Sequence, residues 1–439
     1  MLSAPFYLAH RQRTQMRNAS FMTAVVIASV FATSMANDWP QFRGPHRDGT
    51  WDETGILEKF PAEGIKIEWK RPVGGGWASP VVADGKVFVL DVELVRPTAR
   101  ERLHCFDEKT GAVFWTFTYD EPYGEWTYDP ERGAGPTATP IIDGGRIYTV
   151  GANGWTHCLD CKNGKMIWEK RIGTEFTVLE MSCRPSPLIE GDLLIVFTGA
   201  RPGASVLALD KTTGKEVWRA LDDTPSNSSP IVIQSGGKRQ LIVWSNVALT
   251  SLDPATGKVL WRETMITSGN DSAATPVFQN GKLLVSGLMV QVTFDPPDEK
   301  IVWPENRAPS KRLLSNTSTP ILRGNYIYSA RGLSDLVCLE VATGHEVWTT
   351  NSITAPKNGA SINITPHDNG YFLFTDEGNL IHAELSPKGY HEISRAHLID
   401  PTWPFNGFKF VYAPPAFANG HIFARNEGEV VCASLQATK

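Results

Sequence analysis

An eleven-residue pattern recurs along this chain and strongly limits the folds that it can adopt. The pattern reads "ALDKTTGKEVW" at residues 208–218 and "SLDPATGKVLW" at residues 251–261, and related copies begin at Cys105, Cys158, Thr293 and Cys338. A seventh copy, at residues 383–394, keeps the spacing but lacks the final Trp. In most copies an Asp side chain can accept turn N–H groups while Gly supplies the left-handed residue. Each copy therefore predicts a tight turn followed by a strand.

A second pattern precedes each copy and shows how many times the unit is repeated. It consists of a small polar residue and Pro, a Gly-containing hairpin turn and an apolar strand, as in "ASPVVADGKVFVL". Its intervals average about 48 residues, the length of a four-stranded propeller blade with loops. The sequence predicts an all-β, eight-bladed propeller of four-stranded antiparallel blades, with one blade for each Pro of the second pattern: Pro80, Pro140, Pro187, Pro230, Pro276, Pro320, Pro366 and Pro415.

Half of the tryptophans occupy one position of the repeat. A large indole with a single N–H suits the gap between adjacent sheets, where its face is buried and its nitrogen donates a hydrogen bond. Four of the six cysteines fall at another repeat position, which is small in the other copies, so the cysteines do not indicate a disulfide framework. We expect the following tryptophans to pack blade against blade: Trp69, Trp115, Trp168, Trp218, Trp261, Trp303 and Trp348.

The two ends of the repeat region indicate how the ring closes. After Pro415 the chain holds only three further strands, so the last blade lacks its outer strand. Residues 65–73 contain Trp69 but follow no turn motif. We predict that this early strand completes the last blade and removes the open edge, which gives a closed ring that functions as a monomer.

The start of the chain has the composition of a secretory signal peptide. Arg11, Arg13 and Arg17 precede the apolar residues 21–32, and small residues follow up to Ala36. We predict a signal peptide over residues 1–36, an extended strap over residues 37–64 and the propeller over residues 65–439. We expect the strap, with His46 and Arg47, to pack on the outer wall of the ring. The protein would then be periplasmic or extracellular, with no transmembrane anchor.

The charge balance excludes some classes of partner. Without residues 1–36 the chain has 39 basic and 47 acidic residues, a formal net charge of −8. Such a surface lacks the basic patch that binds nucleic acid or anionic lipid. Cys158 and Cys161 form a C-x-x-C step without the second pair that a zinc site needs.

The repeat A-x-D-x-x-T-G-x-x-x-W resembles that of the eight-bladed quinoprotein-like propellers over residues 65–435. The chain is also similar to the propeller subunit of the outer-membrane barrel-assembly machinery, a non-catalytic scaffold. Enzymes of this fold stack pyrroloquinoline quinone (PQQ) between a Trp and a disulfide of adjacent cysteines and hold calcium nearby. This chain has no adjacent cysteines. The resemblance implies the fold, while activity depends on a site that the repeat does not encode.

Candidate site residues come from the loops that precede each repeat Pro, because these loops surround one mouth of the central channel. Three aromatic segments, residues 119–133, 401–412 and 74–78, lead into neighbouring blades, so we expect them to line one side of the mouth or to plug it. Asn270 and Asp271 offer oxygens to a hard cation. Asn316 and Asn363 also precede a repeat Pro. The candidate ligand-binding residues are Trp77, Trp126, Arg184, Asn270, Asp271, Trp403, Lys409 and Tyr412.

These observations favour an exported, non-catalytic binding or scaffold propeller of the cell envelope. We expect no cofactor or metal and no catalytic residues, and a partner that is an envelope protein or a small ligand or glycan at the channel mouth. The first alternative is a PQQ- and calcium-dependent dehydrogenase of alcohols or sugars. The second alternative is a carbohydrate-binding propeller that uses the aromatic mouth.

Overall fold

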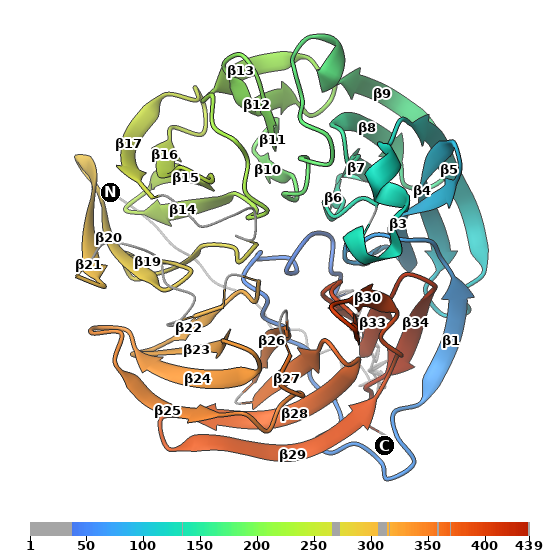
Figure 1. The fold of residues 1–439 in the computed structure, drawn as a ribbon, viewed down its shortest axis with the longest axis vertical. Coiled ribbons are helices and arrows are strands. Elements are labelled where there is room, and N and C mark those ends of the chain that lie inside the picture. Colours follow the sequence, from blue (N-terminus) through green and yellow to red (C-terminus); the bar gives the residue numbers. More distant parts are fainter. Residues whose placement is uncertain are drawn as a thin grey trace, which may run out of the picture. The chain divides into compact units, whose positions relative to one another are not determined.

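The computed structural model describes residues 37–133, 135–265, 273–305, 314–315, 317–357, 360–368 and 370–437. The predicted signal peptide lies outside these residues. The described residues contain eight four-stranded sheets, which we call blades 1 to 8, arranged around a common centre (Figure 1). The prediction of eight antiparallel blades is therefore confirmed.

Blades 1 to 7 each consist of four consecutive strands that pair antiparallel with their neighbours in the chain. The first strand lies nearest the centre and the fourth lies outermost (Figure 1). Blades 1 to 4 are β2–β5 (Val81–Ala83, Lys86–Val95, Thr98–Asp107, Val113–Glu121), β6–β9 (Ile141–Asp143, Arg146–Val150, Trp155–Asp160, Met166–Arg171), β10–β13 (Leu188–Glu190, Leu193–Ala200, Ala204–Asp210, Glu216–Ala220) and β14–β17 (Ile231–Ser235, Lys238–Trp244, Ala248–Leu252, Val259–Thr264). Blades 5 to 7 are β18–β21 (Val277–Gln279, Lys282–Val285, Leu288–Phe294, Pro297–Trp303), β22–β25 (Ile321–Arg323, Tyr326–Arg331, Asp335–Glu340, Glu346–Thr350) and β26–β29 (Ile362–His367, Gly370–Thr375, Asn379–Ser386, Gly389–His397).

Blade 8 joins the two ends of the propeller. Its inner strands are β32 (Ala416–Ala418), β33 (His421–Arg425) and β34 (Glu429–Ser434), and its outer strand is β1 (Ile67–Pro72). Strand β1 pairs antiparallel with β34, with Trp69 opposite Cys432 and Lys70 opposite Val431. The predicted closure is confirmed, and the blade 8 sheet has no open outer edge at β34.

The repeated tryptophans connect each blade to the next. Trp218 of blade 3 donates its indole N–H to the Pro254 carbonyl in a turn of blade 4, at 3.1 Å. Its ring covers Gly257 of that turn, where an added Cβ would lie 2.5 Å from the indole. Because this Gly also has a positive φ of 72°, the turn needs Gly for both space and conformation. Trp69, Trp115, Trp168, Trp303 and Trp348 donate in the same way to Glu108, Cys161, Lys211, Val341 and Ser386.

Trp261 makes the same connection through an intermediate side chain. Its N–H donates to the Gln240 side-chain oxygen at 2.7 Å, and the Gln240 amide donates to the Thr293 carbonyl of blade 5 at 2.8 Å. The following turn, residues 295–297, lacks the Thr-Gly pair of the other copies. The predicted role of the seven tryptophans between blades is therefore confirmed, with one variation.

The junction between blades 7 and 8 has no repeat Trp, and the strap supplies the missing ring. Ser394 stands at the Trp position, opposite His382 of β28. The Phe60 N–H donates to the Ser394 hydroxyl at 3.0 Å, and the Phe60 ring stacks 6.3 Å from Phe372. A residue from outside the repeats thus fills the gap that the seventh copy leaves open.

The strap crosses the centre of the ring, so the prediction that it lies on the outer wall is wrong (Figure 1). Trp39 pairs with Val82 of β2, and the Trp51 N–H donates to the Pro366 carbonyl of β26. Arg47 is 9% exposed and donates to the backbone carbonyls of Ser186, Pro187 and Pro230, at the starts of blades 3 and 4. An Arg in a loop usually stays in water; the unpaired carbonyls at the start of the inner strands explain why Arg47 is buried here.

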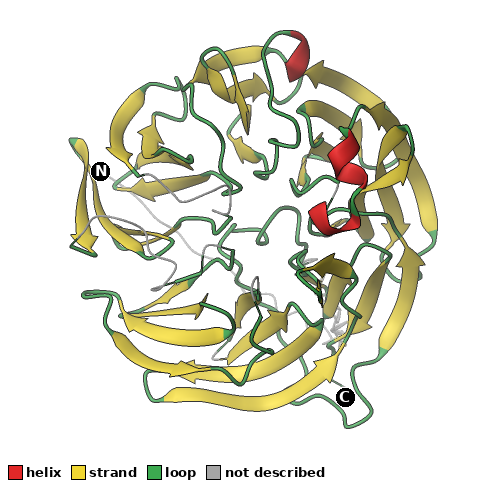
Figure 2. Ribbon diagram, in the orientation of Figure 1, coloured by secondary structure: helices red, strands yellow, loops and turns green. Residues whose placement is uncertain are grey.

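Short secondary-structure elements lie in the loops between blades. They are the 3-10 helices η1 (Glu125–Tyr128), η2 (Pro130–Arg132) and η3 (Ile172–Thr174), shown in red in Figure 2, and a two-stranded sheet of β30 (Trp403–Phe405) and β31 (Phe408–Phe410). Within the described ranges, no helix has the length and apolar character needed to cross a bilayer.

Candidate functional site

The antiparallel order of the strands gives the ring two different faces. The loop face carries the connections from each outer strand to the next inner strand and the turns between second and third strands. The turn face carries the turns between first and second strands and the Asp-x-x-Thr-Gly turns. The candidate residues that the structure describes come from the connections on the loop face, or from the inner strand that follows one.

Five aromatic side chains on the loop face form one cluster, which we call the aromatic cluster: Trp77, Trp403, Phe405, Phe410 and Tyr412. The ring of Trp77 lies 4.9 Å from Trp403 and 5.5 Å from Tyr412, both edge to face. Phe410 stacks on Tyr412 at 5.2 Å, and Trp403 stacks on Phe405 at 5.1 Å. Two of the three predicted segments, residues 74–78 and 401–412, thus come together as expected from closure of the ring.

Charged side chains that sequence reasoning missed surround this cluster. Trp77 donates its N–H to the Glu427 carboxylate at 3.0 Å, and Thr402 donates to the same group. Lys357 is 6% exposed, forms an ion pair of 2.9 Å with Asp376 and lies 4.9 Å from the Phe410 ring. Burial raises the pKa of Asp376, against the lowering effect of Lys357. These four polar residues do not belong to the two repeated patterns, so the sequence analysis could not identify them as part of a site.

The third aromatic segment reaches the cluster with its last residue, because Gly133 lies against Trp77 and Trp403, but its aromatic rings do not pair with the five rings of the cluster. Tyr119 and Tyr123 are buried and donate their hydroxyls to Glu101, whose pKa is raised by burial. Trp126 is 40% exposed and donates to the Glu180 carboxylate at 2.8 Å. The prediction that aromatic residues from 119–128 join the mouth is therefore wrong, because Glu101 and Glu180 hold them elsewhere.

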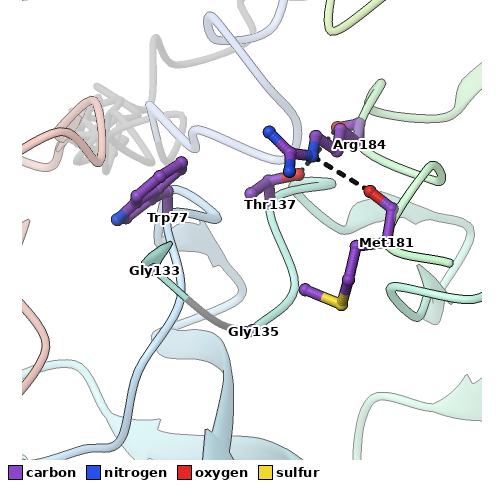
Figure 3. A pocket seen from close by; sticks show the side chains of 6 residues that line it. All are labelled: Trp77, Gly133, Gly135, Thr137, Met181 and Arg184. Carbon is purple, nitrogen blue, oxygen red and sulfur yellow. Dashed lines mark hydrogen bonds between the residues drawn. The ribbon is translucent and has the colours of Figure 1, made fainter. Parts of the chain in front are cut away.

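Arg184 and Trp77 stand on opposite sides of a small space (Figure 3). Arg184 donates to the Met181 carbonyl at 3.0 Å, and its own carbonyl accepts from Thr137. The space measures about 10 Å³, which is room for about one water molecule. Trp77 and Arg184 thus belong to one part of the loop face, but the structure packs them with only this small gap between them.

Two of the remaining predicted residues are described. Lys409 is exposed on β31, and Asn363 is half-buried in β26. Asn270, Asp271 and Asn316 lie outside the described residues.

Exposed apolar side chains distinguish the loop face from the turn face. In the described part of the chain, fourteen large apolar residues are exposed; eight lie on outer strands and none lies in a turn of the turn face. The other six lie on the loop face, three of them in neighbouring loops of blades 1 to 3. These six are Val95, Trp126, Leu179, Val247, Leu333 and Phe408.

Polar contacts join three of these loops into a single ridge. Arg96, next to Val95, lies over the Tyr128 ring at 5.1 Å and 3.7 Å from the Glu125 carboxylate. Glu180, next to Leu179, accepts hydrogen bonds from Trp126 and from the Gly124 N–H. We call Val95, Trp126 and Leu179, with their loops, the apolar ridge. Sequence reasoning found Trp126 but missed the other two, which have no aromatic or charged signature.

The described residues do not fit PQQ and calcium. An added Cβ at Gly133 would lie 2.7 Å from Trp77, so a loop already lies against the ring of this candidate residue. All six cysteines are buried and free, and burial raises the pKa of Cys161 to about 12. In the described ranges, no three His, Cys, Asp or Glu side chains are grouped to hold a metal ion.

Comparisons with known proteins point to one family. A family model described as "Outer membrane protein assembly factor BamB" matches residues 99–350, more than half of the chain. The outer membrane protein assembly factor BamB of Burkholderia pseudomallei is 23% identical over 233 residues, which cover 51% of this chain and 58% of that protein. The match therefore spans less than two thirds of that relative's length.

Solved structures share the fold at low sequence identity. BamB from Moraxella catarrhalis superposes with a TM-score of 0.56 and 16% identity, covering 84% of this chain and 99% of that one. A europium-containing methanol dehydrogenase superposes with a TM-score of 0.63 and 11% identity, covering 91% and 98%. An assembly factor and a dehydrogenase thus share this architecture, so the fold alone does not indicate which function the chain has.

Proposed function

The chain belongs to the family described as outer membrane protein assembly factor BamB, and from this premise we propose that it is a non-catalytic binding propeller of the cell envelope. Its partner would be an envelope protein, and its role would be to hold that partner during assembly of outer-membrane proteins. The matched relatives are named as outer membrane protein assembly factors, which supports a role in that process.

The observation that carries the proposal is the distribution of exposed apolar residues. Val95, Trp126 and Leu179 project from one ridge on the loop face, while large apolar residues are absent from the exposed turns of the described turn face. Exposed apolar groups that gather on one face are typical of protein-binding surfaces. A partner that covers the ridge would remove them from water, and the aromatic Trp126 is the type of residue that dominates such interfaces.

The close packing around Trp77 supports a surface contact over a small-molecule site at this position. The aromatic cluster packs edge to face, and the gap beside Trp77 holds about one water molecule. Binding pockets for small molecules usually have a few hundred Å³ of space. A surface contact on the ridge needs no such space.

Photo-crosslinking in the host cell tests this proposal. A benzoylphenylalanine placed at Val95 or Leu179 should form adducts with envelope proteins after irradiation. Val217 is the matched control, because it is 54% exposed on the outer strand β13, compared with 64% for Val95 and 49% for Leu179. The proposal is contradicted if the ridge positions give no adducts, or the same adducts as Val217.

Two further measurements address the alternatives. Purified protein is mixed with PQQ and calcium, and dye reduction is followed with a panel of alcohols; quinone uptake with turnover would favour the dehydrogenase. Glycan-array binding that is lost in Trp403→Ala or Trp126→Ala would favour the carbohydrate-binding propeller. We expect neither signal.

A further inference from the structure

A second cavity, of about 370 Å³, lies on the turn-face side of the ring centre. The strap forms one wall with Asp48, Thr50 and Asp52, and the ends of three inner strands form the other with residues 277–279, 321–323 and 366–368. The cavity is therefore built from blades 5, 6 and 7 and exists only because the strap crosses the ring. Its volume lies within the range of small-molecule sites.

His367 offers a hydrogen-bond acceptor to this cavity. Its side chain lines the cavity although the residue is only 7% exposed. Its Nδ1 lies 2.9 Å from the Trp51 carbonyl oxygen, which can only accept, so Nδ1 carries the proton in the neutral ring. No described residue donates a hydrogen bond to Nε2. The Nε2 lone pair is thus available to a ligand N–H.

A second acceptor lies beside the first. The Asp368 carboxylate is 3.7 Å from His367 Nε2, too far for a hydrogen bond between them. Two acceptors at this separation can accept from one donor group placed against both of them. An ammonium group has three N–H donors and carries the charge that a carboxylate prefers.

The charges around the cavity favour a cation. Asp48, Asp52 and Asp368 contribute three carboxylates, and Arg323 contributes the one Lys or Arg side chain among the lining residues. Arg323 is already engaged, because it donates to the Asp368 carbonyl at 2.6 Å and lies over the Tyr371 ring at 5.3 Å. The cavity is therefore negative overall and rejects anions.

Much of the rest of the wall is apolar, although Thr50 and Gln279 also line it. Val277 and Phe278 of β18 and Leu322 of β22 are half-buried and line the cavity. Such a surface suits methylene groups and not a hydrated ion. In agreement, the described residues contain no trio of His, Cys, Asp or Glu that would hold a metal ion.

We infer that this cavity binds a small aliphatic diamine cation. One ammonium group would bridge His367 Nε2 and the Asp368 carboxylate, the methylene chain would lie against Phe278 and Leu322, and the second ammonium group would meet Asp52 on the strap. This site is separate from the proposed partner surface, because the ridge lies on the loop face and the cavity faces the turns.

Isothermal titration calorimetry with 1,4-diaminobutane at low ionic strength tests the inference. We expect saturable binding to one site per chain. Asp52→Asn and Asp368→Asn should each weaken binding about two- to fivefold, the range for a partly exposed ion pair, and the double variant should lose about the product. 1-Aminobutane, with one ammonium group, should bind more weakly than the diamine.

The matched control is Asp192→Asn. Asp192 is exposed in the turn of blade 3 between β10 and β11, on the same face as Asp368, but it does not line the cavity. The inference is overturned if the diamine shows no saturable binding, if Asp192→Asn weakens binding as much as Asp368→Asn, or if calcium or glucose binds there and the diamine does not. Because Asp52 and Asp368 are exposed, these variants should keep the melting temperature of the wild type.

Discussion

Trp218 illustrates how one repeated residue contributes to the fold through two separate interactions. Its buried ring covers Gly257, and its N–H donates to Pro254. We expect Trp218→Ala to lower the free energy of unfolding by about 3–5 kcal/mol, the cost of a large cavity. Trp218→Phe keeps much of the ring, so its packing loss should be smaller. It also removes the hydrogen bond of the indole N–H, which should lower the free energy of unfolding by about 1 kcal/mol more. Urea denaturation followed by circular dichroism measures both.

Trp126→Ala is the control for that series. Its side chain is 40% exposed, so its removal should change stability by less than about 0.5 kcal/mol. Equal losses at Trp218 and Trp126 would show that the repeat position has no special role.

Glu121 should make stability depend on pH. Burial and the nearby Glu101 raise the pKa of Glu121 to about 7, from an ordinary value of 4.5. A raised pKa means that the folded protein holds the proton more tightly, so this contribution to stability is full below about pH 4.5 and disappears as the pH rises through 7. The urea midpoint of the wild type should fall with pH across this window more steeply than that of Glu121→Gln. Parallel profiles for the two proteins would contradict this.

At the level of single residues, the sequence predicted packing better than it predicted the site. The seven tryptophans recur at one position, and the structure confirms their role. Trp126 and Trp403 look alike in sequence, yet one is exposed beside Glu180 and the other is buried among aromatic rings. The difference depends on a glutamate 54 residues away, which no local pattern reveals.

Among the elements, the strap departs most from expectation. Residues 37–64 have no periodic pattern, so their path could not be derived from sequence, and no motif supported the expected outer-wall position. The structure places Arg47 on three backbone carbonyls at the starts of blades 3 and 4, where burial lowers its pKa to about 9. The strap is therefore part of the ring's interior, together with Phe60 at the junction that has no Trp.

Arg47→Ala tests the anchoring of the strap. Removing the guanidinium leaves carbonyls without a donor, so we expect a loss of about 2–3 kcal/mol in unfolding free energy. Limited trypsin digestion should also cut the strap faster in the variant than in the wild type, at Arg43 or Lys59. Lys66→Ala, whose side chain is 75% exposed, is the control and should leave the cleavage rate of the strap unchanged. An unaltered rate in Arg47→Ala would mean that other contacts hold the strap.

For the whole molecule, the number of blades and the closure were predictable because both follow from counting. Eight copies of a strand-forming unit give eight sheets, and an incomplete last copy requires a strand from elsewhere. The proposed partner surface was not predictable, because exposed Val95 and Leu179 lie in loops of different blades. Function thus depends on the loops, which the repeat does not specify.

The aromatic cluster and the position of the strap both depend on the closure of the ring, since the closure brings Trp77 beside Trp403 and fixes the strap across the centre. The most direct test is a cysteine pair across β1 and β34. Lys70 and Val431 face each other in the register, so Lys70→Cys with Val431→Cys should form a disulfide on mild oxidation, seen on a non-reducing gel. The bond would close a loop of several hundred residues and raise the urea midpoint.

The control is Lys70→Cys with Val430→Cys, which is one residue out of register and should form the disulfide poorly. No disulfide in the first pair, or equal yields in both, would contradict the closed ring.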